Sequence, residues 1–438
     1  MNGLKNSVFG MIPQEWDIID ADKYCLKVTD GTHDSPKQKN EGYPLVTSRH
    51  IKGSEIDFDN TYLISEEDYN DINKRSYVSQ WDVIISMIGE YCGFTYLEEN
   101  PEINYAIKNV GLFKTENEID SKWLYYFFQS KTTNYLLNTY RSGTSQPYLS
   151  LGTLRKFPVL IPKNVEEKRE IVSILDSIRL KIELLQAQNK TLEETAQTIF
   201  KEWFGKCQIE DELPEGWRVY QLNELVDTIN GYSYKGKELV EESEEALVTL
   251  KSFDRNGGFQ TRGFKPFKGN AKTTQEVVIG DLVVAHTDLT QDAEVLGNPA
   301  FIFDDGGFDK MFITMDLVKV ISKNEDVSSS FLYYLMKDRL FKGHCVGYSN
   351  GTTVLHLSKK AIPEYQIILP LNFDLIKKFS EISDATTTKI SLNKEAIKTL
   401  TKTRDTLLPK LMSGEIRVNE FRRNETCVAH KPSPTQAP

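Results

Sequence analysis

The sequence predicts an α+β protein in which two mixed α/β domains, related by a pseudo-twofold axis, are joined by two long antiparallel coiled-coil helices. Short motifs return about two hundred residues later, and each copy ends in a charged stretch with heptad-like apolar spacing. A repeat this long describes whole domains rather than the short stacked units of a solenoid. The expected limits are residues 1–163 and 207–372 for the domains, 164–206 and 373–412 for the helices, and 413–438 for a short strand and disordered tail.

The repeat rests on four pairs of motifs that occur in the same order. These are Ile12–Trp16 with Leu213–Trp217, Leu124–Tyr126 with Leu332–Tyr334, Ser142–Thr144 with Asn350–Thr352, and Ile161–Pro162 with Leu369–Pro370.

Each copy shows four apolar, β-rich runs and one amphipathic helix. In the first copy the strands are expected at 43–47, 82–86, 110–113 and 157–161, with a helix over 121–128. In the second copy they are expected at 246–250, 281–285, 317–321 and 365–369, with a helix over 328–336. Unevenly spaced strands with few helices favour an α+β domain over a doubly wound one.

The two charged stretches predict long helices that pair with each other. Over 166–204 the apolar residues recur in alternating steps of four and three, which is typical of a coiled-coil seam. At about 1.5 Å per residue this helix is roughly 58 Å long, and a weaker seam covers 375–411. The residues expected to pair are Ile171, Leu175, Ile178, Ile182, Leu185, Asn189, Leu192 and Ile199 of the first helix, and Ile382, Ile390, Asn393, Ile397, Leu400 and Leu407 of the second.

Two asparagines, one proline and the segment after the second helix lead to three further expectations. Asn189 and Asn393 either fix the register from inside the seam or face solvent at its edge. Pro409 is expected to end or bend the second helix, because proline lacks an amide hydrogen. Residues 413–421 are expected to lie beside residues 10–20 and so connect the end of the second helix to the start of the first domain.

Composition limits the class of protein. The chain has 438 residues, 39% hydrophobic content and a formal net charge of −10, which argues mildly against nucleic-acid binding, although local basic patches can oppose it. The five cysteines have no disulfide or zinc-site spacing, and no apolar run reaches the roughly 20 residues of a membrane span. We therefore expect a cytoplasmic protein with no membrane association.

The sequence shows no recognisable set of catalytic residues and no metal-ligand spacing. Residues 231–237 match the start of a phosphate-binding loop, but Glu238 stands where Ser or Thr should reach magnesium. Residues 298–301 partly resemble the Asn-Pro-Pro-Phe motif of adenine methyltransferases, without its second proline and without a glycine-rich cofactor loop. A basic recognition loop and a plain turn explain these two segments better.

Polar loops at equivalent places in the two copies are the best candidates for a binding surface. Arg and Lys suit guanine edges, Asn and Gln suit adenine, and hydroxyls with glycines suit phosphate. The candidate DNA contacts are Thr47, Ser48, Arg49, His50, Lys52, Arg141, Ser142, Thr144, Ser145 and Gln146 in the first copy, and Lys235, Lys237, Lys251, Ser252, Arg255, Thr287, Gln291, Ser349, Asn350, Thr352 and Thr353 in the second.

From residue 10 to 422 the chain resembles the specificity (S) subunit of type I restriction–modification systems. The resemblance is carried by Leu407–Val418, Arg169–Asp176, Ala196–Phe204 and the Pro-x-x-Trp entry of each copy. Gly31–Pro36 with Leu45–Ser48 looks like one common type of target recognition domain, and Thr287–Asp292 looks like another.

The resemblance implies a non-catalytic subunit that reads a bipartite double-stranded DNA target. Each target recognition domain would read one half-site, and the helices would set the gap between them. Two methyltransferase (M) subunits would methylate an adenine in each half with S-adenosylmethionine, flipping the base out of the duplex. Motor-nuclease (R) subunits would cleave with ATP and magnesium, so this chain itself would need no cofactor. The alternatives are a self-contained DNA modification enzyme and a coiled-coil scaffold that binds only proteins.

Overall fold

The computed structural model describes residues 3–143, 146–207, 209, 211–253 and 258–418. The chain divides into two compact units: unit 1 comprises residues 1–182 and 399–438, and unit 2 comprises residues 183–398. The division falls inside both long helices, α6 (Val165–Phe204) and α10 (Asp374–Ser413), so each helix contributes one part to each unit. The domain limits expected from the sequence stay predictions.

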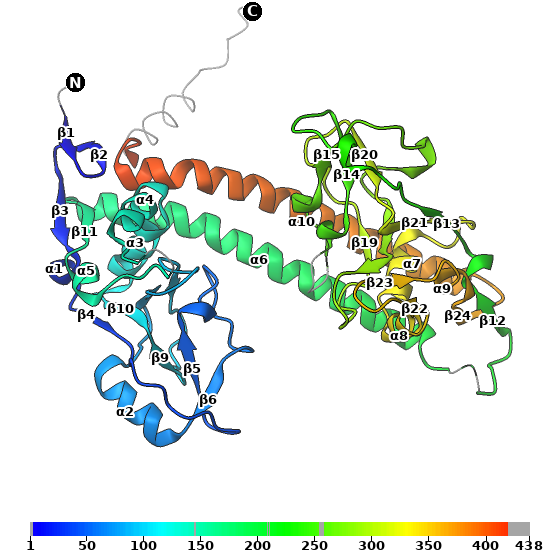
Figure 1. Cartoon of the computed structure of the whole chain (residues 1–438), viewed down its shortest axis with the longest axis horizontal. Helices are drawn as coiled ribbons and strands as arrows, with labels where there is room; N and C mark the ends of the chain where they lie inside the picture. The colour runs from blue at the N-terminus through cyan, green and yellow to red at the C-terminus, as the bar shows by residue number, and fades with distance from the viewer. Residues whose placement is uncertain (1–2, 144–145, 208, 210, 254–257, 419–438) are drawn as a thin grey trace, which may run out of the picture. The chain divides into compact units, whose positions relative to one another are not determined.

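Unit 1 is a mixed α/β body (Figure 1), and its described residues form four small sheets. Its central sheet is antiparallel and has the order β4-β10-β7-β8. A second sheet, β6-β5-β9, contains the parallel pair β5 and β9, and two-stranded sheets join β11 to β3 and β1 to β2. The strands are β1 Leu4–Ser7, β2 Gly10–Pro13, β3 Trp16–Asp20, β4 Lys27–Asp30, β5 Tyr43–Thr47, β6 Tyr62–Ile64, β7 Val83–Ser86, β8 Thr95–Leu97, β9 Ala106–Lys108, β10 Val110–Lys114 and β11 Pro158–Pro162. The shorter helices are α1 Ala21–Tyr24, η1 Ser48–His50, α2 Glu66–Ser76, α3 Glu118–Gln129, α4 Lys131–Tyr140 and α5 Leu151–Arg155.

Unit 2 repeats this topology with insertions. Its antiparallel sheet β13-β21-β17-β19 corresponds to the central sheet of unit 1, β12-β24 corresponds to β3-β11, and β15-β14-β20-β16 again contains a parallel pair, β14 and β20. A further sheet has the order β18-β23-β22. The strands are β12 Trp217–Gln221, β13 Val226–Asn230, β14 Glu245–Val248, β15 Lys265–Pro266, β16 Glu276–Val277, β17 Leu282–Ala285, β18 Thr287–Asp288, β19 Pro299–Phe301, β20 Lys310–Ile313, β21 Leu317–Ser322, β22 Ser349–Asn350, β23 Leu355–Leu357 and β24 Gln366–Pro370. The shorter helices are η2 Leu222–Glu224, η3 Gly236–Glu238, η4 Leu250–Ser252, η5 Thr261–Gly263, η6 Thr273–Gln275, α7 Ser329–Met336, α8 Arg339–Gly347 and α9 Ala361–Glu364.

The equivalent helices α3 and α7 show how local sequence sets the repeat. Each begins at a capping side chain: Asn117 accepts the amide hydrogen of Asp120, and Ser328 accepts that of Phe331. The helix α3 therefore begins at Glu118, three residues before the range 121–128 expected from the sequence. Both helices then bury a dense aromatic face that packs in the core of its own unit.

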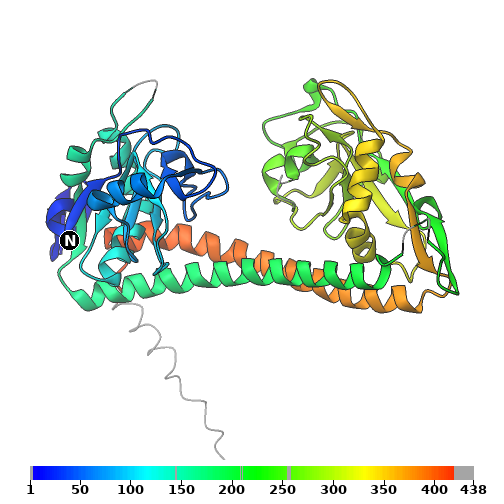
Figure 2. The same ribbon diagram turned by 90° about the horizontal axis from the view of Figure 1, so that it is seen from below.

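In unit 1, α3 lies beside α6, and the end of α10 joins the same core (Figures 1 and 2). Ile171 and Leu175 of α6 are fully buried with Leu411 of α10, and Trp16 and Trp123 complete this cluster. Burial of several large side chains stabilises this junction, since each contributes about 1.5–3 kcal/mol.

In unit 2, the helices α6, α7 and α10 meet through aromatic rings, among them Phe200, Phe331 and Phe379. Of the residues expected to pair, Ile182, Leu185 and Ile390 are buried, whereas Ile178, Leu192, Ile199, Ile397, Leu400 and Leu407 are half-buried. Ile382 differs from the expectation because it is 38% exposed, and the adjacent Ser383 is fully buried in its place.

The two seam asparagines contact each other inside unit 2. Asn393 is only 3% exposed, and its Nδ2 donates to Asn189 Oδ1 at 2.8 Å and to Gln188 Oε1 at 2.9 Å. Of the two interpretations left open by the sequence, these contacts favour a buried register device for Asn393 over a solvent-facing one.

The end of α10 differs from the expectations in two respects: the helix does not end at Pro409, which was one of the two alternatives for that residue, and the short strand expected after it is not formed by residues 414–418. The helix does not end at Pro409 but continues to Ser413, because Leu408, Leu411 and Met412 are anchored in the core of unit 1. Residues 414–418 form no strand; the chain turns instead at Gly414, which has a φ of +72° and lies against Pro13 and Trp16. Residues beyond 418, where a disordered tail was expected, lie outside the described residues.

Candidate nucleic-acid interface

In unit 1 the polar loops predicted from the sequence meet at the ends of β5 and β7. The hydroxyl of Ser48 donates to the carbonyl of Asn109 at 2.7 Å and accepts the amide hydrogens of Met87 and Ile88 at 3.1 and 3.2 Å. This single hydroxyl therefore ties the turn after β5 to the loop after β7. The turn itself is closed by His50, whose Nδ1 accepts the amide hydrogen of Thr47 at 3.0 Å.

Residues 141–143 and 146–148 join the same place. Tyr148 forms antiparallel bridges with both Ile88 and Ser142, and the amide of Gly89 donates to the carbonyl of Pro147 at 2.9 Å. The guanidinium of Arg141 donates to the carbonyl of Cys92. Three loops that are far apart in the sequence thus form one surface of unit 1.

The side chains of this surface fall into two groups. Ser48 and His50 are 6% and 1% exposed, and burial lowers the pKa of His50, which keeps its imidazole neutral as an internal hydrogen-bond acceptor. Arg49, Ser142 and Gln146 are exposed, and Lys52 Nζ lies 3.9 Å above the centre of the Tyr91 ring. Ser48 and His50 therefore hold the loops in place. The side chains of the second group are available to a ligand.

Unit 2 builds the equivalent surface from a different set of side chains. Thr249 Oγ1 accepts the amide hydrogen of Lys251 at 3.3 Å and donates to the carbonyl of Gly263 at 2.8 Å, which joins η4 to η5. Gly263 has to be glycine, because a Cβ there would overlap the backbone of Ser252. The loop after β17 forms the short strand β18, which pairs with β23 of the 349–357 hairpin.

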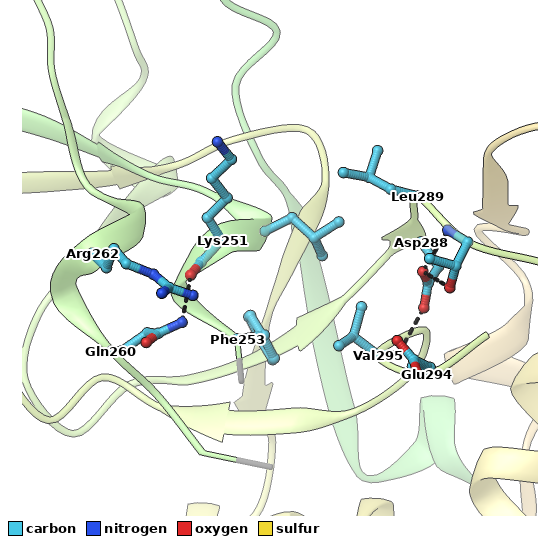
Figure 3. A pocket seen from close by; sticks show the side chains of 10 residues that line it. Lys251, Phe253, Gln260, Arg262, Asp288, Leu289, Glu294 and Val295 are labelled. Carbon is cyan, nitrogen blue, oxygen red and sulfur yellow. Dashed lines mark hydrogen bonds between the residues drawn. The ribbon is translucent and has the colours of Figure 1, made fainter. Parts of the chain in front are cut away.

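These loops of unit 2 surround a pocket of about 580 Å³ (Figure 3). Lys251 and Arg262 lie on one side of it, and Leu289 and Glu294 lie on the other. Gln260 Nε2 donates to the carbonyl of Lys251 at 3.0 Å. The lining is completed by Leu250, Phe253, Asp288, Thr290 and Val295. The pocket therefore combines cations, carboxylates, an amide and apolar side chains, the groups with which proteins contact base edges.

The loop on the Leu289 side is held rigidly. The buried carboxylate of Asp288 accepts the amide hydrogens of Thr290, Val295 and Leu296 at 2.9, 2.7 and 3.2 Å. Burial would raise the pKa of Asp288, but these hydrogen bonds outweigh it and lower the pKa, so the carboxylate is ionised at neutral pH. From the other side Lys342 donates to the carbonyls of Glu294 and Leu296 at 3.1 and 2.6 Å.

Both copies of the repeat match one known protein family. The sequence matches the type I restriction modification DNA specificity domain over residues 27–194 and again over residues 214–402. The chain belongs to this family. It is a specificity subunit of a type I restriction–modification system, as the resemblance implied.

Individual relatives agree in name and in length. The MjaIX type I restriction enzyme specificity subunit of Methanocaldococcus jannaschii is 24% identical over 447 aligned residues, covering 95% of this chain and 97% of that protein. The MjaVIII specificity subunit of the same organism is 22% identical, covering 96% of each chain. The crystal structure of the S subunit of a type I restriction–modification system from M. genitalium has the same fold, with a TM-score of 0.56 at 17% identity over 90% of this chain and 96% of that one.

The structure places the remaining predicted contacts of the specificity subunit as follows. Lys251 and Gln291 are exposed at the pocket and its loop, and Asn350, Thr352 and Thr353 are exposed on the 349–357 hairpin, where Ser349 is half-buried. Ser252 and Thr287 are buried, at 0% and 3% exposure, and Thr47 is half-buried. Lys235 and Lys237 are exposed at η3, which belongs to the separate cluster around Phe267. Thr144, Ser145 and Arg255 lie outside the described residues.

Gln260 and Arg262 were missed by the sequence reasoning. They lie between η4 and β15, in a segment of unit 2 that shares no motif with unit 1. The sequence held one signal for this segment, Gly263, which follows the basic residue Arg262. A glycine allows two backbone segments to approach each other closely.

Within the described ranges, no group of three or more His, Cys, Asp and Glu side chains is arranged to hold a metal ion. Among the helices that the structure describes, none combines the length and apolar character needed to cross a lipid bilayer.

Proposed function

We propose that this specificity subunit reads a DNA target made of two unlike half-sites, one for each unit. The observation that carries the proposal is that equivalent loops meet at equivalent places in both units, yet present different side chains. Unit 1 offers Arg49, Lys52 and Gln146, whereas unit 2 offers Lys251 and Arg262. Different donors at one place in the fold imply different base sequences.

The long helices are proposed to pair as an antiparallel coiled coil and to set the gap between the half-sites. Support comes from the buried contacts that α6 and α10 make within each unit, including the hydrogen bond between Asn393 and Asn189. Inserting one helical turn of about four residues in both helices adds about 6 Å. The half-sites should then stay the same while the gap grows by one or two base pairs. An unchanged gap with changed half-sites would contradict this role.

We further propose that the reactive chemistry belongs to other chains. Two M subunits would bind S-adenosylmethionine and methylate one adenine per half-site, and R subunits would supply ATP- and magnesium-dependent cleavage. The specificity subunit would then be non-catalytic and would act in the cytoplasm with its partners. The alternative, a self-contained modification enzyme, predicts stoichiometric S-adenosylmethionine binding to the isolated chain, which calorimetric titration measures directly.

The central test is to map methylated adenines in the genome of a host that carries this chain with its M subunits. A split sequence with one methylated adenine in each half is the expected result. Duplexes that contain this sequence should bind with steep salt dependence and lose about 1–3 kcal/mol for each mismatched base pair. Binding that does not depend on sequence would favour a protein scaffold instead.

A further inference from the structure

Among the exposed apolar side chains of unit 2, Leu289 has an unusual setting. It is 64% exposed, and it lines the same pocket as Lys251 and Arg262 (Figure 3). A single exposed leucine is common on protein surfaces and needs no explanation by itself. Here, however, it stands among the cationic and amide groups that are proposed to meet DNA.

The loop that carries Leu289 is fixed from both sides. Asp288 accepts three backbone amide hydrogens of the loop, and Lys342 donates to two of its carbonyls. Ala293 has a φ of +51°, which costs energy for a residue with a Cβ and which the surrounding contacts hold in place. The leucine is thus presented by a preorganised loop, so little conformational entropy remains to be lost when it binds.

Unit 1 has an apolar side chain at the same point of its fold. The loop after β7 corresponds to the loop after β17, and it carries Phe94, which is 43% exposed, and Tyr91, which lies under Lys52. In both units, therefore, an apolar group on this loop stands near a cation from the turn after β5 or β14. This recurrence argues that the apolar group belongs to the reading surface.

We propose that Leu289 reads a thymine by apolar contact with its C5-methyl group in the major groove. This inference rests on the proposed function and assigns one specificity-determining contact within it. The C5-methyl is the one apolar feature among the base edges of the major groove, and side chains that touch it are apolar. Lys251 and Arg262 across the pocket suit the phosphates or guanine edges beside it. The exposed carboxylate of Asp292 on the same loop suits a cytosine amino group and disfavours phosphate.

The test replaces single thymines by deoxyuridine, which removes only the methyl group. The full chain in complex with its M subunits is titrated with duplexes that carry the mapped target, each with one thymine of one half-site replaced. One position in the half-site read by unit 2 should weaken binding about fourfold, the worth of one buried methyl group. In Leu289→Ala the same replacement should change the affinity less than twofold. Leu340→Ala, which truncates a 71% exposed leucine on α8 of the same unit, should respond like the wild type.

The outcomes separate this inference from the function on which it rests. A wild-type preference for the target over a scrambled duplex tests the proposed function independently. If that preference holds but no deoxyuridine affects binding, or the effect persists in Leu289→Ala, the thymine contact is wrong. A half-site for unit 2 without any A·T pair would also overturn it.

Discussion

Arg417 should hold the two ends of the chain together within unit 1. Its Nε and Nη2 donate to the carboxylate of Glu167 at 2.6 and 3.0 Å, and its Nη1 contacts Glu15. Glu167 is 3% exposed and also accepts a hydrogen bond from the indole of Trp16 at 3.3 Å. This arrangement joins the segment after α10, the start of α6 and the entry to β3.

The cost of Arg417→Met follows from the burial of its two partners. Removing one member of a buried ion pair costs about 3–5 kcal/mol, because the other charge is left without a partner. Arg417 is 27% exposed and the Trp16 indole still donates to Glu167, so we expect about 2–3 kcal/mol for the local contact. The half-exposed Glu15 adds little, since exposed pairs contribute about 0–1 kcal/mol.

Hydrogen exchange measured by mass spectrometry tests this value locally. Peptides covering residues 11–20 and 405–418 should exchange roughly 30- to 150-fold faster in Arg417→Met, the equivalent of 2–3 kcal/mol in the opening equilibrium. Arg218→Met in unit 2 is the matched control, because it removes a half-exposed pair with Glu224; it should accelerate exchange less than threefold. The double variant Arg417→Met with Glu167→Leu should recover much of the protection, because no lone charge remains buried.

Two results would contradict this local role of Arg417. One is an acceleration below threefold in Arg417→Met, which would mean that water replaces the guanidinium at no cost. The other is an equal acceleration in peptides of unit 2, which would mean that the substitution acts on global stability and not on this junction.

Three further predictions concern single residues. In urea unfolding, Gly414→Ala should destabilise unit 1 by more than Gly216→Ala destabilises unit 2. Both glycines have positive φ, but only at position 414 would the new Cβ also lie against Pro13. Equal losses of unfolding free energy would contradict this close approach. Asp176→Asn should lower the unfolding free energy at neutral pH, since burial would raise the pKa of Asp176 but hydrogen bonds led by Lys122 lower it below 3.8. The stabilisation is therefore complete above the unfolded pKa and is lost as the pH falls through the lower folded pKa. The unfolding free energies of the wild type and Asp176→Asn, measured as a function of pH, should converge only below pH 3.8. Asn393→Ala should lower the free energy of unfolding by about 1–3 kcal/mol, because two buried hydrogen bonds are lost. Lys389→Ala on the exposed side of α10 should lower it much less. An equal effect in both variants would argue against a buried register contact.

The sequence predicted the elements well where a single local pattern decides them. Every strand named beforehand in the two copies is present, as are α3, α7 and both long helices. These segments are apolar runs or periodic faces whose burial follows from their own composition. Because the motifs recur in the same order, the repeat also predicted that the elements of the two copies correspond. The matching strand orders of their sheets confirm this.

Tertiary contacts decided what the sequence did not show. Pro409 is a helix breaker by local chemistry, but the anchoring of Leu408 and Leu411 in the core carries the helix past it. Arg262 enters the pocket only because η5 folds back onto η4, a contact between segments that no periodicity reveals. The candidate loops were predicted as polar segments. Their division into Ser48, which holds the loops, and Arg49, which faces outward, depends on the tertiary fold.

The repeat also explains how unlike recognition surfaces can share one support. At the same position of each long helix stands an aspartate: Asp176 accepts from Lys122 at 2.5 Å, and Asp384 accepts from the hydroxyl of Ser330 at 2.5 Å. A carboxylate can accept from a cation or from a hydroxyl, so the helix side of the contact stays constant while the domain side varies. The cation of unit 1 is the more demanding partner, because a buried lysine needs carboxylates, here Asp176 and the half-exposed Glu118 at 2.7 Å, whereas a hydroxyl can find other acceptors. Ser330→Ala should therefore lower the free energy of unfolding much less than Asp176→Asn does. Equal losses would show that the charge of the partner does not decide the strength of these two contacts.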